Sequence, residues 1–203
     1  MARWQCHPAG VRGHCATASD FRFQHRCRQP VDVAKAKQHT EYMGFAMTDF
    51  ADRRRMMVDT QIRPSDVTKF PIIDAMLAVA REGFVPDADR EAAYADQNLD
   101  LGNGRCLLEP RTLAKMLDVL DIQPDELVLD VACGLGYSSA VIARLAQMVI
   151  AVEEDAEMAG EAQTLLLESG ADNAVVHEGA LADGAAEHGP YDVVLVQGGV
   201  GKL

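Results

Sequence analysis

The residues best suited to chemistry lie where a short apolar run ends in an acid and a glycine turn. The segment from Val128 to Tyr137 reads VLDVACGLGY. Glycines at such a turn let a ligand approach the backbone beside the N-terminus of the following helix. Glu153 ends the next apolar run, twenty-three residues after Asp130. A carboxylate there reaches a ribose diol in doubly wound folds, so the pattern indicates a nucleotide-type cofactor.

Two other interpretations of this turn compete. A dinucleotide fingerprint needs a third glycine in G-x-G-x-x-G, and this chain has Ser139 at that place. An acid inside the strand end, directly before the turn, is more typical of methyltransferases. The other alternative is that Gly134 and Gly136 only close a corner between strand and helix.

The elements that position these residues follow from periodicity. Apolar runs predict buried strands over residues 127–131, 149–152, 174–177 and 192–196. The intervening segments predict helices at 137–146 and 156–169. This alternation indicates an α/β fold with a doubly wound, mostly parallel sheet and right-handed crossovers. Before it, amphipathic helices are predicted over 50–62, from Ser65 or Asp66 to about Ala80, and over 111–120, with an irregular stretch at 94–109.

Charge divides the chain unevenly. Residues 1–46 hold seven Lys/Arg and three Asp/Glu, whereas residues 47–203 hold twelve and twenty-eight. The net charge of −12 argues against nucleic acid as a partner, and no stretch of eighteen apolar residues suggests a membrane span. The five cysteines have no paired spacing, which predicts free thiols and a reducing, cytoplasmic compartment.

We expect residues 1–46 to be disordered or translated upstream of a start at Met47. They contain Cys and His, but in no standard zinc-ligand spacing, and they are Arg-rich without the amphipathic stripe of a transit peptide. The predicted domain is 47–203, with N-terminal helices at 50–120 and a cofactor-binding half at 125–203.

From about Met57 to Val200 the chain resembles the protein-L-isoaspartate O-methyltransferase family. The resemblance rests on blocks that follow in the family's order: 57–63, Ala75-Met76, 84–86, 93–96, 101–104, 130–137 and 191–196. It implies a Rossmann-like, S-adenosylmethionine-dependent methyltransferase fold without a metal. The positions that it assigns to the cofactor are Asp130, Ala132, Cys133, Gly134, Gly136, Glu153 and Ala180.

Several positions depart from the family pattern. Leu108 stands where the family places its active-site serine, so no catalytic residue is assigned. Ala132 replaces the first glycine of the turn, and Ala180 stands where an Asp would hold the adenine amine. The chain ends at Leu203, whereas the family continues through three more strands. We therefore expect a sheet that is incomplete after the fourth strand, poor activity, and oligomers formed through that strand.

The resemblance implies methyl transfer to the carboxylate of isoaspartyl residues in damaged proteins or peptides, a repair reaction. A carboxylate is already an anion near neutral pH, so the reaction needs alignment and exclusion of water rather than a general base. Two alternatives stay open, which Leu108 favours: a methyltransferase of this fold with another acceptor, and a non-catalytic cofactor-binding protein.

Overall fold

A computed structural model describes residues 49–199 of the chain, within the compact unit Phe45–Leu203. The expectation for residues 1–46 lies outside the described part. The helices of the described part are α2 (Phe50–Met57), α3 (Phe70–Ala78), α4 (Pro110–Leu120), α5 (Tyr137–Ile142) and α6 (Ala156–Glu168). Its short helices are the π-helical η1 (Val58–Ile62) and the 3-10 turns η2 (Arg63–Ser65), η3 (Arg81–Phe84), η4 (Asp87–Ala92) and η5 (Ala186–His188).

The strands form two separate sheets. A small antiparallel hairpin contains β1 (Leu99–Gly102) and β2 (Arg105–Leu107). The main sheet contains β3 (Leu127–Val131), β4 (Met148–Glu153), β5 (Ala174–Glu178) and β6 (Val193–Val196). All its pairs are parallel, and the order β5-β4-β3-β6 places β3, the first strand of this sheet along the chain, between the second and the fourth.

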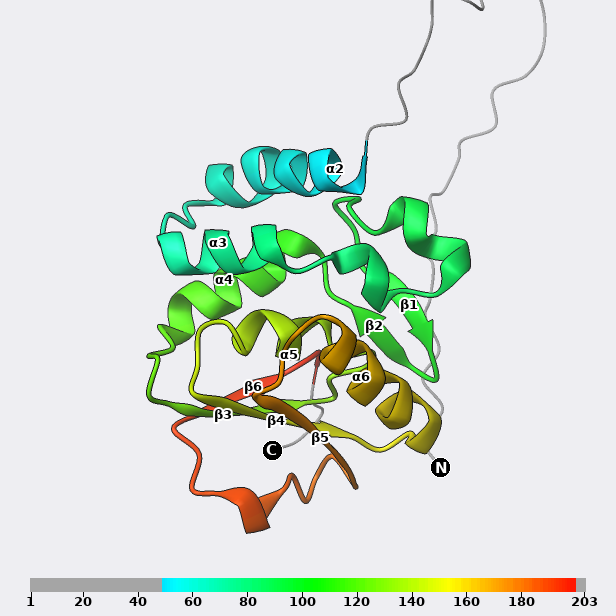
Figure 1. The fold of residues 1–203 in the computed structure, drawn as a ribbon, viewed down its shortest axis with the longest axis vertical. Helices are drawn as coiled ribbons and strands as arrows, with labels where there is room; N and C mark the ends of the chain where they lie inside the picture. Colours follow the sequence, from blue (N-terminus) through cyan, green and yellow to red (C-terminus); the bar gives the residue numbers. More distant parts are fainter. Residues whose placement is uncertain (1–48, 200–203) are drawn as a thin grey trace, which may run out of the picture. The chain divides into compact units, whose positions relative to one another are not determined.

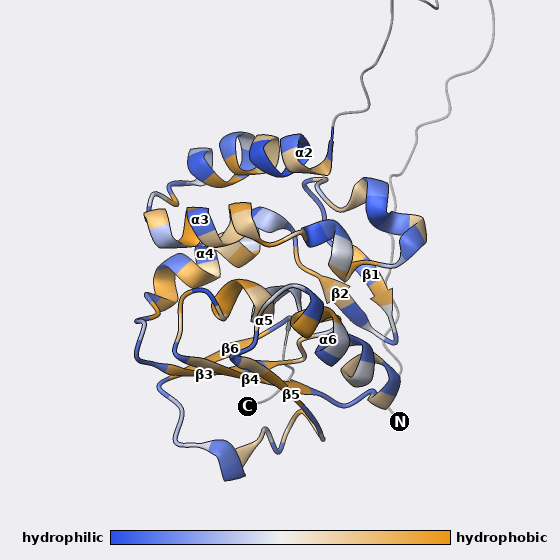
Figure 2. Cartoon of the chain, viewed as in Figure 1, coloured by the Kyte–Doolittle hydropathy of each residue, from blue (hydrophilic) through white to orange (hydrophobic). Residues whose placement is uncertain are grey.

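Helices cover one face of this sheet. Figure 1 shows α4, α5 and α6 on that face, with α3 and α2 in further layers above them. The segment that contains η5 crosses the opposite face, where Ala185 belongs to one buried apolar cluster with Leu129 and Val152. Figure 2 shows that the strands are predominantly hydrophobic, as expected for a sheet packed on both faces. Their carboxyl ends lie at one edge, where ligands bind in open α/β folds.

The structure corrects some of the predicted boundaries. Ser65 and Asp66 do not cap the second helix, because α3 begins at Phe70 with Pro71 in its first turn. Asp66 has a left-handed φ of 68° and follows η2 instead. Helix α5 ends at Ile142 rather than at residue 146 and continues as turns, in which the Leu145 amide donates to the Ile142 carbonyl at 2.8 Å.

The sequence predicted an irregular stretch at 94–109, but part of this stretch is regular. It contains the β1–β2 hairpin, which turns through Gly102, Asn103 and Gly104, all at positive φ. A three-residue strand carries too little alternation to be recognised from its sequence, so this element was missed.

Strand β6 lies at the edge of the sheet. Among the described residues it pairs only with β3. Val194 on this strand is 53% exposed, which agrees with the expected apolar edge. None of the helices within residues 49–199 has the length and apolar character needed to cross a membrane.

Candidate cofactor site

The glycine turn between β3 and α5 requires glycine at two positions. Gly134 and Gly136 have φ values of 58° and 90°, in the left-handed region. A Cβ on Gly134 would lie 2.9 Å from Leu101 Cδ1, and one on Gly136 would lie 3.3 Å from Leu166 Cγ. The predicted turn therefore forms, with its backbone closely packed on both sides.

Ala132, at the start of this turn, is also left-handed, with a φ of 62°. The Ala132 and Cys133 amides both donate to the Val152 carbonyl, at 2.9 and 3.3 Å. Those bonds hold the start of the turn against β4. An alanine in this conformation is strained by about 1–2 kcal/mol, which explains why a glycine is typical of this position.

Asp130 is fully buried beneath the turn. Its Oδ2 accepts hydrogen bonds from the Ser138 and Ser139 hydroxyls, both at 2.6 Å, and its Oδ1 accepts one from Gln197 Nε2 at 2.9 Å. Burial raises the pKa of this carboxyl, and the three hydrogen bonds oppose that rise. Asp130 therefore positions the glycine turn and the start of α5, and it presents no surface to a ligand.

Cys133 is buried within the turn. Burial, together with the charges of Asp130 and Glu153, raises the pKa of its thiol well above the usual range. A thiol held protonated is a poor nucleophile. The structure thus agrees with a packing role for Cys133 beside the cofactor site.

Glu153, at the end of β4, is the carboxylate that the sequence assigned to a ribose. Its Oε2 accepts from the Gly134 amide at 3.1 Å, and its Oε1 accepts from the Glu154 amide at 2.9 Å. Arg105 Nε lies 3.0 Å from both Glu153 oxygens. Glu153 has no exposed surface, so a ribose could reach it only if Arg105 moved away.

The hairpin that carries Arg105 lies over the carboxyl edge of the sheet. Besides the Arg105 contact, Asn103 Nδ2 donates to Asp155 Oδ2 at 2.7 Å, and Leu101 packs against Gly134. Arg105 Nη2 also lies 3.0 Å from Glu154 Oε1. Burial lowers the pKa of Arg105, but its bonds to Glu153 and Glu154 outweigh that effect and raise it overall. The hairpin therefore covers Glu153 and the end of β4.

Two predicted positions remain, Ala180 and Leu108, and each directly follows or lies close to the end of a strand. Ala180 follows β5 and is exposed, while the adjacent Gly179 amide donates to the Glu153 carbonyl at 3.0 Å. Leu108 follows β2 and is half-buried. Its carbonyl accepts from Arg81 Nη2 at 2.7 Å, so a buried arginine fixes the backbone of this position.

The sequence left some of these residues unassigned. Ser138, Ser139 and Gln197 support Asp130, and the two serines could have been noticed as polar positions in an apolar helix. Arg81 Nε also donates to the Ala93 carbonyl at 2.6 Å, and its guanidinium lies 4.7 Å from the centroid of the Tyr137 ring. No local pattern reveals such a buried arginine.

The residues present fit a nucleoside cofactor. A carboxylate at the end of β4 and a glycine turn at the end of β3 lie within hydrogen-bonding distance of each other, at the edge where such ligands bind. Fold and turn together define the class of S-adenosylmethionine-dependent methyltransferases with a Rossmann-like sheet.

Comparison with known proteins identifies the family. Residues 52–203 match the family model for protein-L-isoaspartate(D-aspartate) O-methyltransferase, and the chain belongs to this methyltransferase family. It is 36% identical over 148 residues to protein-L-isoaspartate O-methyltransferase of Roseiflexus castenholzii, covering 73% of this chain and 67% of the relative. It is 33% identical over 178 residues to the protein of that name from Synechococcus sp., covering 88% of this chain and 72% of the relative.

Solved structures support the fold. A protein-L-isoaspartate O-methyltransferase superposes with a TM-score of 0.62 at 24% identity, over 70% of this chain and 47% of that one. A Plasmodium falciparum protein described as a candidate member, in complex with S-adenosyl-L-homocysteine, gives a TM-score of 0.63 at 17% identity over 74% and 75%. At these identities the likeness concerns the fold.

Proposed function

We propose that the chain transfers a methyl group from S-adenosylmethionine to the carboxylate of L-isoaspartyl residues in damaged proteins and peptides. The observation that carries the proposal is the pairing of Glu153 with the glycine turn, through the Gly134 amide at 3.1 Å, in a chain of this family. The cofactor supplies an electrophilic methyl group. The relatives' names state the same reaction.

The residues of this chain have binding and orienting roles in the proposal. Glu153 accepts hydrogen bonds from the ribose hydroxyls after Arg105 has left it. Gly134 lets the cofactor lie against the backbone, next to Ala132 and Cys133, once Leu101 of the hairpin has moved, and Gly136 lets the same turn pack closely against Leu166 of α6. Asp130 holds that backbone in place from below, and Ala180 borders the adenine without a hydrogen-bonding side chain.

The acceptor needs alignment rather than activation. A carboxylate is ionised near neutral pH, so this chain has no proton to remove from it. The backbone at Leu108, fixed by Arg81, forms part of the proposed acceptor site. The β1–β2 hairpin already covers this edge of the sheet, so it must move to admit the cofactor, and its return over the bound cofactor would exclude water. A water-free site strengthens the electrostatic alignment of the acceptor oxygen.

The direct test is a methylation assay with labelled cofactor and two peptides that differ only in one isoaspartyl or normal aspartyl residue. Labelling of the isoaspartyl peptide alone is expected. Cofactor binding without labelling of either peptide would contradict the proposed substrate. It would favour the alternatives that Leu108 suggests, another acceptor or a non-catalytic role.

The cofactor site has its own test. Glu153→Gln should weaken S-adenosylmethionine binding at least about tenfold by calorimetry, because a charged acceptor for the ribose is lost. Glu154→Gln is the matched control, since Glu154 also contacts Arg105 but is 54% exposed. Equal affinities in the two variants would reject Glu153 as the ribose ligand.

The apolar surface beside β6 supports a further proposal, self-association. Met116, Val119 and Leu120 of α4 border the same groove as Val194 and Val196 of β6. An apolar edge with open backbone groups favours pairing with a second chain. Size-exclusion chromatography with light scattering tests this, and a monomer at all concentrations would refute it.

We also propose a reducing, cytoplasmic location, which the free thiols of Cys106 and Cys133 support.

A further inference from the structure

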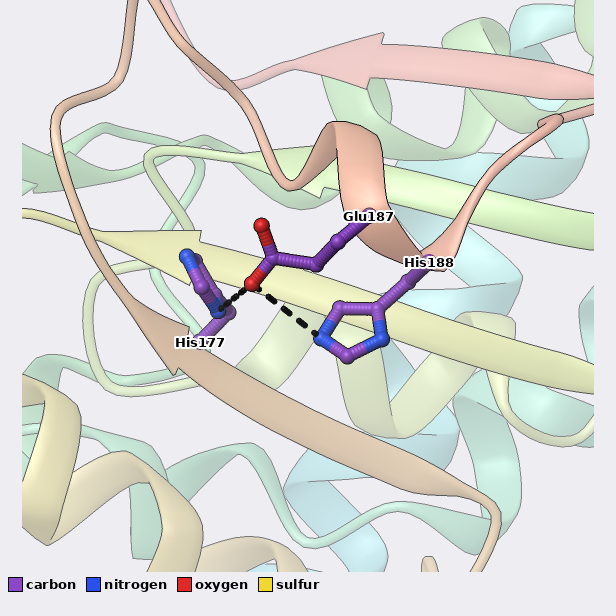
Figure 3. A group of neighbouring side chains, drawn as sticks. All are labelled: His177, Glu187 and His188. Carbon is purple, nitrogen blue, oxygen red and sulfur yellow. Dashed lines mark ion pairs between the residues drawn. The ribbon is translucent and has the colours of Figure 1, made fainter.

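Three side chains with metal-ligating atoms converge on the sheet face opposite α5 and α6. His177 lies near the end of β5, while Glu187 and His188 belong to η5 (Figure 3). In the parallel register His177 pairs with Val152, which shares a buried apolar cluster with Ala185 just before η5. Nine residues of chain separate His177 from Glu187, so the fold rather than the local sequence brings them together.

The donor atoms are close to the spacing that a metal ion requires. Glu187 Oε1 lies 3.7 Å from His177 Nδ1 and 3.9 Å from His188 Nε2. One ligand atom from each residue lies within 4.8 Å of the others. Metal–ligand bonds of about 2.0–2.2 Å in tetrahedral geometry place donors roughly 3.3–3.6 Å apart. Small side-chain movements would therefore bring both histidines and the carboxylate onto one ion.

The backbone that carries these ligands is anchored on both sides. The Tyr191 hydroxyl donates to the Ala185 carbonyl at 2.6 Å, and the His188 amide donates to the same carbonyl at 3.0 Å. Ala185 itself is buried in the sheet face. The His177 ring packs against Gly179, where an added Cβ would lie 3.0 Å from Nε2. The backbone that carries the ligands is thus largely preorganised.

The ring arrangement also suits a shared ion. Figure 3 shows the Glu187 carboxylate between the two imidazole rings, whose centroids are 5.7 Å apart and whose planes meet at 79°. One nitrogen of each ring, His177 Nδ1 and His188 Nε2, therefore lies beside the same carboxylate oxygen. His188 and Glu187 are 44% and 66% exposed, so solvent can supply a further ligand.

We propose that His177, Glu187 and His188 form a binding site for a divalent transition-metal ion of the zinc type. Imidazole nitrogens favour zinc, nickel and copper, whereas magnesium and calcium favour all-oxygen sites. The bound ion closes residues 177–188 into a loop and fastens η5 to β5. Ala180 lies within that loop, so the ion stabilises the chain beside the proposed adenine position. The site is independent of the methyl-transfer chemistry.

The test is zinc binding to the full, chelator-treated chain, measured by equilibrium dialysis and calorimetry. Four further histidines and three cysteines lie in residues 1–46, so the wild type is compared with the double variant His177→Gln/His188→Gln. We expect the double variant to bind one zinc equivalent fewer. Loss of direct ligands should weaken that site by more than the roughly 10–100-fold that loss of an outer-shell partner causes.

Glu178→Gln is the matched control, because Glu178 is exposed on β5 next to His177 but lies outside the cluster. It should keep the wild-type zinc count, and magnesium should not replace zinc. Equal zinc counts and affinities in the wild type and the double variant would overturn the proposal.

A second measurement uses only the wild type. Copper(II), added until the resonances of residues 1–46 no longer change, should broaden the amide resonances of residues 176–179 and 185–189 in a 15N-labelled sample, because a paramagnetic ion relaxes nearby nuclei. Sharp resonances of residues 176–179 and 185–189 at that end point would overturn the proposed site. This result does not depend on the stability of any variant.

Discussion

Arg105 Nε lies 3.0 Å from each carboxylate oxygen of Glu153, at the end of the strand that carries the proposed ribose ligand. The two residues are 48 positions apart, and the β1–β2 hairpin brings them together. Arg105 and Glu153 are 15% and 0% exposed at their side chains. In the proposed site the guanidinium occupies the hydrogen-bonding positions that ribose hydroxyls need, so we expect cofactor binding to compete with this ion pair.

The first prediction follows from that competition. Arg105→Gln should tighten S-adenosylmethionine binding about tenfold, because a charge-assisted contact worth roughly 1.5–3 kcal/mol no longer has to be broken. The same substitution should lower the melting temperature of the cofactor-free protein, since Glu153 is then buried without its cation. Calorimetry and thermal unfolding measure the two effects.

Arg63→Gln serves as its control, because Arg63 forms an exposed ion pair with Asp59 away from the site. Weaker cofactor binding in the Arg105 variant would show instead that the arginine helps to hold the ligand.

A second prediction concerns the missing hydroxyl. Leu108→Ser should raise methyl transfer to an isoaspartyl peptide about ten- to hundredfold, because a hydroxyl donor to the substrate carboxylate contributes roughly 1.5–3 kcal/mol. Leu108→Ala removes the same side chain without adding a donor and controls for the added space. If both variants gain methyl-transfer activity equally, or if neither gains any, then the missing hydroxyl does not limit the reaction at this position.

The third prediction tests the strain at Ala132. Ala132→Gly should stabilise the protein by about 1 kcal/mol, since relief of a left-handed alanine outweighs the greater freedom of glycine in the unfolded chain. Urea denaturation measures the change. Ala140→Gly, at a buried position of α5, should destabilise by about 1 kcal/mol because that residue is helical. A loss of stability on Ala132→Gly would show that the left-handed conformation of Ala132 is not strained.

The fourth prediction is a pH dependence at Asp130. Burial raises the pKa of this carboxyl in the folded state, although its hydrogen bonds oppose the rise. A carboxyl with a raised folded-state pKa binds more protons when folded, so stability is lost as pH rises from the unfolded pKa through the folded one. Asp130→Asn removes this dependence. The free energy of unfolding of the wild type should therefore fall relative to that of the variant as pH rises from about 4 to 7.

Urea denaturation at several pH values tests this. Asp125→Asn, at an exposed position, controls for the loss of one negative charge. A difference between wild type and Asp130→Asn that stays constant with pH, or grows in favour of the wild type, would be inconsistent with a raised pKa.

The sequence alone determined the parallel sheet and the place of the cofactor turn. Four apolar runs separated by helical segments allow few other arrangements, and all four strands form where they were predicted, within one residue at each end. Gly134 and Gly136 were identifiable because a tight turn after a buried strand needs left-handed residues. The family resemblance was also readable, since its blocks follow in order along the chain.

Only the tertiary structure decided what surrounds that turn. Arg105 reaches Glu153 across 48 residues, Gln197 reaches Asp130 across 67, and Arg81 reaches the Leu108 carbonyl across 27. Such contacts depend on how separate elements pack, and they leave no periodic signal in the residues between them. The sequence does not reveal the convergence of His177 with Glu187 and His188 either, because a strand and a short turn become neighbours only when the chain crosses the sheet face.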